Sequence, residues 1–216
     1  TTSFLVTKSL EGLRRIQGGP VKELRAPITI PLLGNLITAL EHVCTNKYEQ
    51  SLFTAAFSIA FFGLLRIGEF TAPNSMHTGH RFLHINDVQV SDNIMHLRIR
   101  WSKTDQLGLS TTLKIHATGG LYCPVNNMHL YLKNRMHATS DHLFVHLNAK
   151  PLTRYQFTSV LRKSLQFINA PGYIRSHSFR IGGATYFSSQ GVPEEQLKVM
   201  GRWNSAAYTR YIRFTP

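Results

Sequence analysis

Acidic residues are scarce in this sequence. Among its 216 residues, 11 Asp and Glu stand against 24 Lys and Arg, which gives a formal net charge of +13 and an isoelectric point of about 10.1. The imbalance is strongest from Lys150 onward, where the only acidic residues are Glu194 and Glu195. An excess so unevenly placed favours a polyanion as partner, either nucleic acid or an acidic membrane surface, over a merely soluble basic protein.

Cysteines are even fewer. Cys44 and Cys123 lie far apart and form no CxxC pair, which excludes a disulfide framework and fits a reducing compartment. Long hydrophobic runs are also missing, because the apolar run at 52–65 is interrupted by Thr54 and Ser58 and is too short to cross a bilayer. No signal peptide is recognisable. The apolar share of 43% nevertheless allows a sizeable core in one domain.

Helical patterns dominate the first third of the chain. Residues 1–17 look helical and end at the breaker Gly-Gly-Pro of 18–20. A helix is expected to begin near Pro31, with Thr29 as its N-cap. The next helix, from about 49 to 70, is apolar on almost all sides, so we expect it at the centre of the fold.

Strand patterns replace the helical ones in residues 82–116. The segment HLRIRW at 96–101 alternates apolar and basic residues, and LSTTLKIH at 109–116 alternates again. The turn-rich SKTDQLG at 102–108 joins them, which predicts an antiparallel hairpin.

The rest of the chain returns mainly to helical patterns. We expect helices at 124–136, 154–168 with Thr153 as N-cap, 178–190, 194–200 and 206–214, and a short strand at HLFVH, 142–146. The predicted fold class is therefore α+β, mainly α: a helical bundle with a small antiparallel β-sheet.

Arg66 and Glu69 lie near the end of the apolar helix, in GLLRIGEF. A buried Arg needs a partner, and Glu69 three residues further on is suitably placed. Read alone, this pair is more typical of a structural ion pair. The functional alternative is a rigidly held guanidinium whose remaining donors bind an oxyanion.

Lys103 falls in the turn of the predicted hairpin. Continued alternation would point it to the core, so the strand must end or bend before it. A lysine on a turn is well placed to reach a substrate, although a solvated turn lysine is commoner.

His177 and Arg180 lie three apart at the predicted start of a helix, where anions are favoured. Ser176 or Ser178 would cap this helix, and the following pair of glycines permits close backbone approach. A surface His and Arg is an equally good interpretation of this segment alone.

These segments, taken in order over residues 20–216, resemble the catalytic domain of the tyrosine recombinase family. That family carries an Arg after a buried helix, a Lys on a β-hairpin, a His-x-x-Arg at a helix start, a Gly-His or Gly-Trp, and a Tyr near the end. The matching residues here are Arg66, Lys103, His177, Arg180, Trp203 and Tyr211. The wording of the segments is most similar to recombinases of eukaryotic mobile elements, such as DIRS-like retrotransposons and Cryptons.

The resemblance implies DNA cleavage and rejoining through a 3′-phosphotyrosine, without cofactor or metal. His177 would accept the proton of the tyrosine, whose free pKa is ~10. Arg66 and Arg180 would hold the phosphate oxygens, and Lys103 would protonate the leaving 5′ hydroxyl. Trp203 would donate its N–H or pack the site.

Three residues are expected to support this site, namely Glu69, Arg202 and Tyr208. Arg202 competes with Trp203 for the family's His or Trp position. Tyr211 is favoured over Tyr208 as nucleophile, because it lies eight rather than five residues past Trp203.

The family likeness also implies partners and a location. We expect double-stranded DNA as the substrate, a homo-oligomer on DNA that is a tetramer in synapsis, no membrane and no small-molecule substrate. A eukaryotic protein of this kind would act in the nucleus. Residues 1–19 would be the tail of a preceding DNA-clamping domain or a linker.

Several alternatives remain open at this point. The chain could be a domesticated DNA-binding protein that keeps the fold without cleavage, a type IB topoisomerase, or a helix-turn-helix regulator built on 178–200. The last would leave Arg66 and Lys103 unexplained. Metal binding is disfavoured for the histidines at 77, 80 and 84, which lie in a glycine-containing loop without Cys or carboxylate partners, and for those at 142 and 146, which fall on the strand-like HLFVH.

Overall fold

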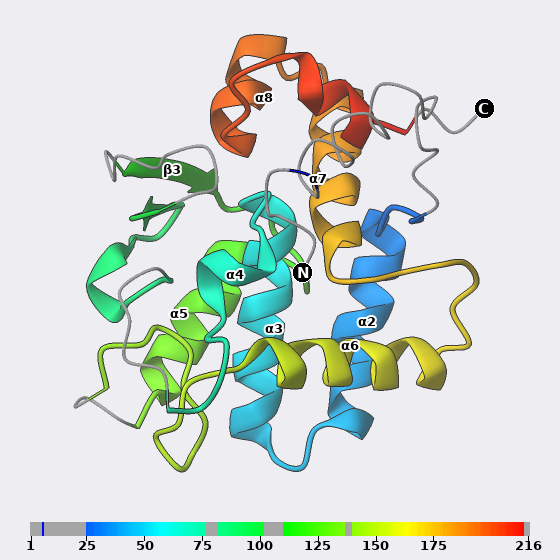
Figure 1. The fold of residues 1–216 in the computed structure, drawn as a ribbon. Helices are drawn as coiled ribbons and strands as arrows, with labels where there is room; N and C mark the ends of the chain where they lie inside the picture. Colours follow the sequence, from blue (N-terminus) through cyan, green and yellow to red (C-terminus); the bar gives the residue numbers. More distant parts are fainter. Residues whose placement is uncertain (1–5, 7–24, 77–81, 102–109, 137–139, 214–216) are drawn as a thin grey trace.

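Helices make up most of the structure, and one small sheet lies at its side (Figure 1). The computed structural model describes residues 6, 25–76, 82–101, 110–136 and 140–213. Its elements are α2 (Ile30–Val43), α3 (Lys47–Phe62), α4 (Ile67–Phe70), η1 (Ile85–Asp87), β1 (Val88–Val90), β2 (Ile94–Ile99), β3 (Thr111–His116), α5 (Pro124–Asn134), α6 (Arg154–Phe167), α7 (His177–Ser189), α8 (Glu194–Gly201) and η2 (Ala206–Tyr211). The predicted fold class is confirmed. Within the described ranges, none of the helices is long and apolar enough to cross a membrane.

Helix α3 occupies the centre, as its apolar surface predicts. It packs against α2, α5 and α7, and Phe57 and Phe61 on it are completely buried. The prediction of one helix as far as Phe70 is wrong, because α3 ends at Phe62 and Leu64 adopts a left-handed backbone with φ of 47°. The break turns the backbone before the short α4 begins.

Local capping signals were interpreted correctly at two helices. Thr29 accepts a hydrogen bond from the N–H of Leu32 at the start of α2. Thr153 and Gln156 form a reciprocal capping box at the start of α6. At α7 the expected serine cap is absent: Ser178 instead accepts a hydrogen bond from the N–H of Arg175, ahead of the helix.

The sheet is antiparallel with strand order β1-β2-β3. The alternation predicted for residues 96–101 is confirmed in β2, because Leu97 and Ile99 are buried while Arg98 between them is exposed. Strand β1 was not predicted, since three residues are too few to show a period. The turn at 102–108 lies outside the described residues, as does the helix expected at 1–17 apart from position 6.

The strand predicted at 142–146 is not formed. The segment makes only single bridges, from His142 to His84 and from Val145 to Pro151. Separate backbone bonds, such as that from Leu143 N–H to the Leu83 carbonyl at 3.0 Å, are supplemented by side chains, since the Tyr48 hydroxyl donates to the carbonyl of Val145 at 2.8 Å. The backbone of this buried segment is therefore satisfied without a ladder.

Helix α7 lies unusually close to two other backbones. A Cβ at Gly182 would overlap the carbonyl of Ile28, and one at Gly183 would overlap the carbonyl of Phe61. The N–H of Ile28 also donates to the carbonyl of Ser178 at 3.1 Å. These contacts fix the first turns of α7 against α3 and the segment before α2.

We therefore expect Gly182→Ala to lower the free energy of unfolding by about 1–3 kcal/mol or more, because the methyl group forces backbone apart. The matched control is Gly34→Ala in α2, where the nearest atom to a new Cβ is 4.0 Å away. That change should be neutral or stabilising by up to about 1 kcal/mol through helix propensity. Urea unfolding of both variants checks the pair, and equal effects would contradict the close packing.

Candidate active site

The carboxylate of Glu69 joins two arginines from distant parts of the chain. It accepts from Arg66 Nη1 at 3.1 Å and from the Arg66 backbone N–H at 2.8 Å, which confirms the predicted pair. It also accepts from Arg202 Nη2 at 2.7 Å. Glu69 and Arg202 are each only 3% exposed at the side chain, whereas Arg66 is 22% exposed.

Arg202 is the residue whose place the sequence did not reveal. It ends α8 in the left-handed region, with φ of 55°. Besides Glu69, its guanidinium donates to the carbonyls of Leu64 at 2.8 Å and Met200 at 2.7 Å. The break after α3 is what presents the Leu64 carbonyl to it.

Arg180 in α7 joins Arg66, Glu69 and Arg202 in one cluster, because it shares the Leu64 carbonyl with Arg202, and it is completely buried. It donates to the carbonyls of Leu64 and Gly201, and its guanidinium lies 4.3 Å from the centre of the Trp203 ring. Burial, and after it the charges of Arg202 and Arg66, lowers the pKa of Arg180. The cluster therefore carries more positive charge than Glu69 alone can balance.

Tyr211 lies beside the groups that the family likeness assigns to its activation. Its ring centre is 5.1 Å from that of His177 and 4.9 Å from that of Trp203, and Arg180 lies 5.3 Å from it. The Tyr208 ring also contacts Trp203, with ring centres 6.4 Å apart, but its hydroxyl is directed to α8, where a hydrogen bond to Glu194 raises its pKa. The two tyrosines, alike in sequence, thus occupy different surroundings.

Thr185 of α7 holds the backbone around Tyr211. Its hydroxyl lies 3.2 Å from the Tyr211 carbonyl and accepts from the N–H of Arg213 at 3.0 Å. The helix predicted at 206–214 is present as the 3-10 helix η2, which ends at Tyr211, and position 214 lies outside the described residues. This helix is therefore shorter and more tightly wound than a regular α-helix, as is common for 3-10 segments.

Arg180 and Trp203 each carry a buried side-chain N–H group for which the described residues supply no hydrogen-bond acceptor. These groups are Arg180 Nε and Trp203 Nε1. An unsatisfied buried donor costs roughly 1–3 kcal/mol. Orphan donors beside Arg66, in an excess of positive charge, are suited to an anion with several oxygens.

The remaining predicted residues divide into two groups. Lys103, His77 and His80 lie outside the described residues. His146 pairs with Glu49 at 2.8 Å, and His84 lies against His142. Among the residues that the structure describes, no three His, Cys, Asp or Glu side chains gather as metal ligands.

The chain has the fold of tyrosine recombinase catalytic domains. XerH site-specific recombinase bound to a palindromic difH substrate superposes with a TM-score of 0.68 at 13% identity, over 91% of this chain and 51% of XerH. XerA recombinase gives 0.66 at 16% identity, over 98% of this chain and 70% of XerA. A lambda integrase dimer bound to a COC′ core site gives 0.63 at 13% identity, over 98% of this chain and 52% of the integrase.

No protein-family model and no curated protein sequence matches the chain. The chain spans between about half and seven tenths of the length of these three proteins. At such low identity the likeness establishes the fold, and the chemistry must be argued from the side chains.

We expect Glu69→Ala to lower the free energy of unfolding by roughly 3–5 kcal/mol, because it leaves the buried Arg202 charge without its carboxylate. The matched control is Glu194→Ala, which removes an exposed partner of Lys198 on α8 and should change stability little. Denaturant unfolding measures both. A loss at Glu69 no larger than the loss at Glu194 would show that Glu69 does not hold this cluster together.

Proposed function

We propose that this domain cleaves and rejoins double-stranded DNA through a 3′-phosphotyrosine at Tyr211, in the recombination or integration of a mobile element. The observation that carries the proposal is the convergence of five side chains from three separate segments. Arg66 follows α3, His177 and Arg180 begin α7, and Trp203 and Tyr211 follow α8. The fold shared with DNA-bound recombinases and integrases supports it.

Each group has a physical task in this proposal. The tyrosine hydroxyl has a pKa of ~10, so it needs a base to become a nucleophile, and His177 beside it takes the proton. The phenolic oxygen then attacks phosphorus, and the bond to the 5′ oxygen breaks. Arg66 and Arg180 bind the non-bridging oxygens and stabilise the charge of the transition state. Lys103 is proposed to protonate the leaving 5′ hydroxyl.

The phosphate must reach a guanidinium that is now covered. Arg180 is fully buried beneath the rings of Trp203 and Tyr211. We therefore propose that DNA binding shifts these rings, so that the buried N–H of Trp203 and Nε of Arg180 receive phosphate oxygens as acceptors. The ester formed with tyrosine conserves the energy of the broken phosphodiester, and a second 5′ hydroxyl reverses the step.

The choice of nucleophile is tested with DNA carrying a nick beside the scissile phosphate, which traps the covalent intermediate. We expect Tyr211→Phe to abolish the protein–DNA adduct on denaturing gels, because the attacking oxygen is gone. Tyr208→Phe is the matched control and should keep it, since the Tyr208 hydroxyl is directed to α8. Absence of an adduct from the unaltered chain on every candidate site, with DNA binding intact, would leave only a DNA-binding protein with this fold.

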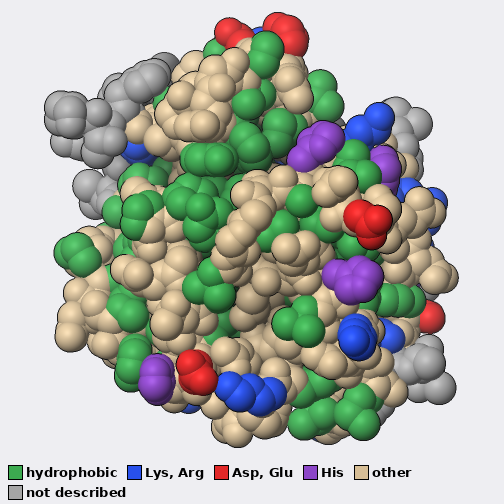
Figure 2. All heavy atoms as spheres, turned by 180° about the vertical axis from the view of Figure 1, so that it is seen from behind, with side chains coloured by type: hydrophobic (Ala, Val, Ile, Leu, Met, Phe, Trp, Pro, Cys, Tyr) green, Lys and Arg blue, Asp and Glu red, His purple; other side chains and the backbone are tan. Residues whose placement is uncertain are grey.

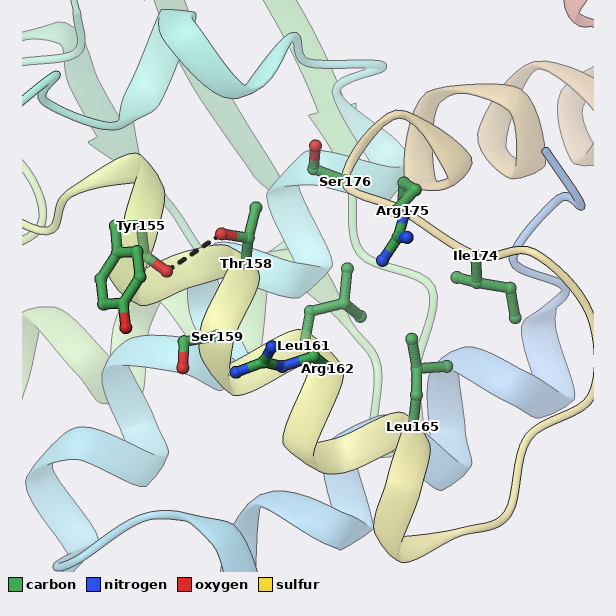
Figure 3. A pocket seen from close by; sticks show the side chains of 9 residues that line it. All are labelled: Tyr155, Thr158, Ser159, Leu161, Arg162, Leu165, Ile174, Arg175 and Ser176. Carbon is green, nitrogen blue, oxygen red and sulfur yellow. Dashed lines mark hydrogen bonds between the residues drawn. The ribbon is translucent and has the colours of Figure 1, made fainter.

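Basic side chains mark the proposed path of the DNA. Arg154, Arg162 and Lys163 are exposed on α6, and Arg175 is exposed just before α7. Arg162 and Arg175 line a cavity of about 230 Å³ between these segments (Figure 3). On the opposite face, Lys and Arg are scattered among hydrophobic and other uncharged side chains, with Asp, Glu and His side chains between them (Figure 2). We propose that DNA lies against the face with α6 and the start of α7.

We expect DNA affinity to fall steeply with salt, because bound phosphates release counterions. Changing Arg162 and Arg175 together to Ala should reduce the slope of log affinity against log salt by about 1 for each arginine. The control is Lys133→Ala on α5, which packs against α3 and the sheet and should leave the slope unchanged. Filter binding or anisotropy between low and physiological salt measures this, and an affinity insensitive to salt would contradict DNA as the partner.

A further inference from the structure

We propose that Arg202 is a positioning residue for phosphate binding by Arg66. The inference rests on the proposed function and adds a residue that acts through Glu69 rather than by touching DNA. Its starting point is the sharing of one buried carboxylate, in which Glu69 Oε1 accepts from Arg66 Nη1 and Oε2 accepts from Arg202 Nη2.

The sharing decides how many donors Arg66 keeps. A carboxylate facing a single arginine usually takes two parallel N–H bonds from its guanidinium. Here Glu69 Oε2 accepts from Arg202 Nη2 at 2.7 Å and from the Arg66 backbone N–H at 2.8 Å, so Arg66 gives Glu69 only one guanidinium bond, through Nη1 at 3.1 Å. Glu69 therefore orients the partly exposed Arg66 guanidinium through one N–H and leaves its other N–H groups available to a phosphate.

The backbone at Arg202 shows that this side chain is held at a conformational cost. Its φ of 55° at the end of α8 is the conformation that glycine adopts most readily after a helix. An arginine is retained there with its guanidinium bound to the carbonyls of Leu64 and Met200 as well as to Glu69. Strain of this kind, held in place by such a set of contacts, is found mostly at functional sites.

Arg202 also links the two halves of the site. It lies between Gly201, whose carbonyl accepts from Arg180, and Trp203, whose ring covers Arg180. A Cβ at Gly201 would overlap the Trp203 ring, so this turn admits no side chain at that position. Through Arg202, the segment that carries Tyr211 is tied to the turn that carries Arg66.

The test is Arg202→Gly, which removes the side chain and suits the left-handed backbone. We expect single-turnover cleavage of the nicked substrate to slow by about 10–100-fold, because small misplacements of a phosphate-binding group cost this much. DNA affinity, set mostly by other phosphates, should change less than about threefold. Arg202→Lys, which keeps a charge but not the fork of donors, should fall between the two rates.

A second change separates positioning from mere support of the fold. In the Arg202→Gly background, Glu69 Oε2 keeps the Arg66 backbone N–H and is expected to accept a second guanidinium bond from Arg66 as well. Adding Glu69→Gln weakens the bonding of residue 69 to the Arg66 guanidinium and should recover part of the lost cleavage rate. If both residues only supported the fold, the double variant would cleave more slowly than either single variant. Thermal unfolding of each variant fixes a temperature at which all are folded.

The outcomes distinguish this proposal from the proposed function. If the unaltered chain forms no adduct, the proposed function fails. If it forms the adduct and Arg202→Gly or Arg202→Lys cleaves at the unaltered rate, the role of Arg202 alone is overturned. The same holds if the double variant is slower than Arg202→Gly. Should Arg202→Gly fail to fold, the rate of Arg202→Lys decides: a several-fold loss supports positioning.

Discussion

The buried carboxylate of Glu69 is the interaction on which the rest of this site depends. It lies between Arg66 and Arg202, which are far apart in the sequence, and it is almost completely shielded from water. A charge in such surroundings is tolerated only when its partners are close and well oriented. Because the two arginines share it, the position of each one constrains the other.

A second constraint is the break between α3 and α4. If the central helix continued, the carbonyl of Leu64 would bond within the helix. In the broken chain it accepts from both Arg180 and Arg202. The glycine pair of α7 brings Arg180 close enough for this contact, since Gly183 lies against the carbonyl of Phe61. The arrangement of the cations therefore depends on the tight backbone packing between α7 and the end of α3.

Much of the fold was predictable because its signals are local. Thr29 and Thr153 cap helices through residues three positions away, and the alternation around Leu97 shows directly which face is buried. The break at Leu64 was not predictable, because an apolar run gives no sign of it. It is stabilised by arginines more than 100 positions further along the chain.

The site shows the same division. The spacing of Arg66 and Glu69 correctly indicated their ion pair, and His177 and Arg180 do lie together near Tyr211. Arg202 looked like an alternative to Trp203, whereas the structure gives the two neighbours separate places. One is buried against Glu69 and the other covers Arg180. The two side chains point to different places because Arg202 adopts a left-handed backbone conformation. A sequence signals that conformation when the residue is glycine, but not when it is arginine.

The central claim is that this cluster binds a phosphate at which Tyr211 becomes covalently linked to DNA. Trypsin provides a direct measurement, because it cuts after Arg202, Arg210 and Arg213 and so places Tyr208 in peptide 203–210 and Tyr211 in peptide 211–213. Mass spectrometry of the trapped adduct after nuclease and trypsin treatment should find the remaining nucleotide on peptide 211–213. A nucleotide on peptide 203–210, or on any other part of the chain, would contradict the account.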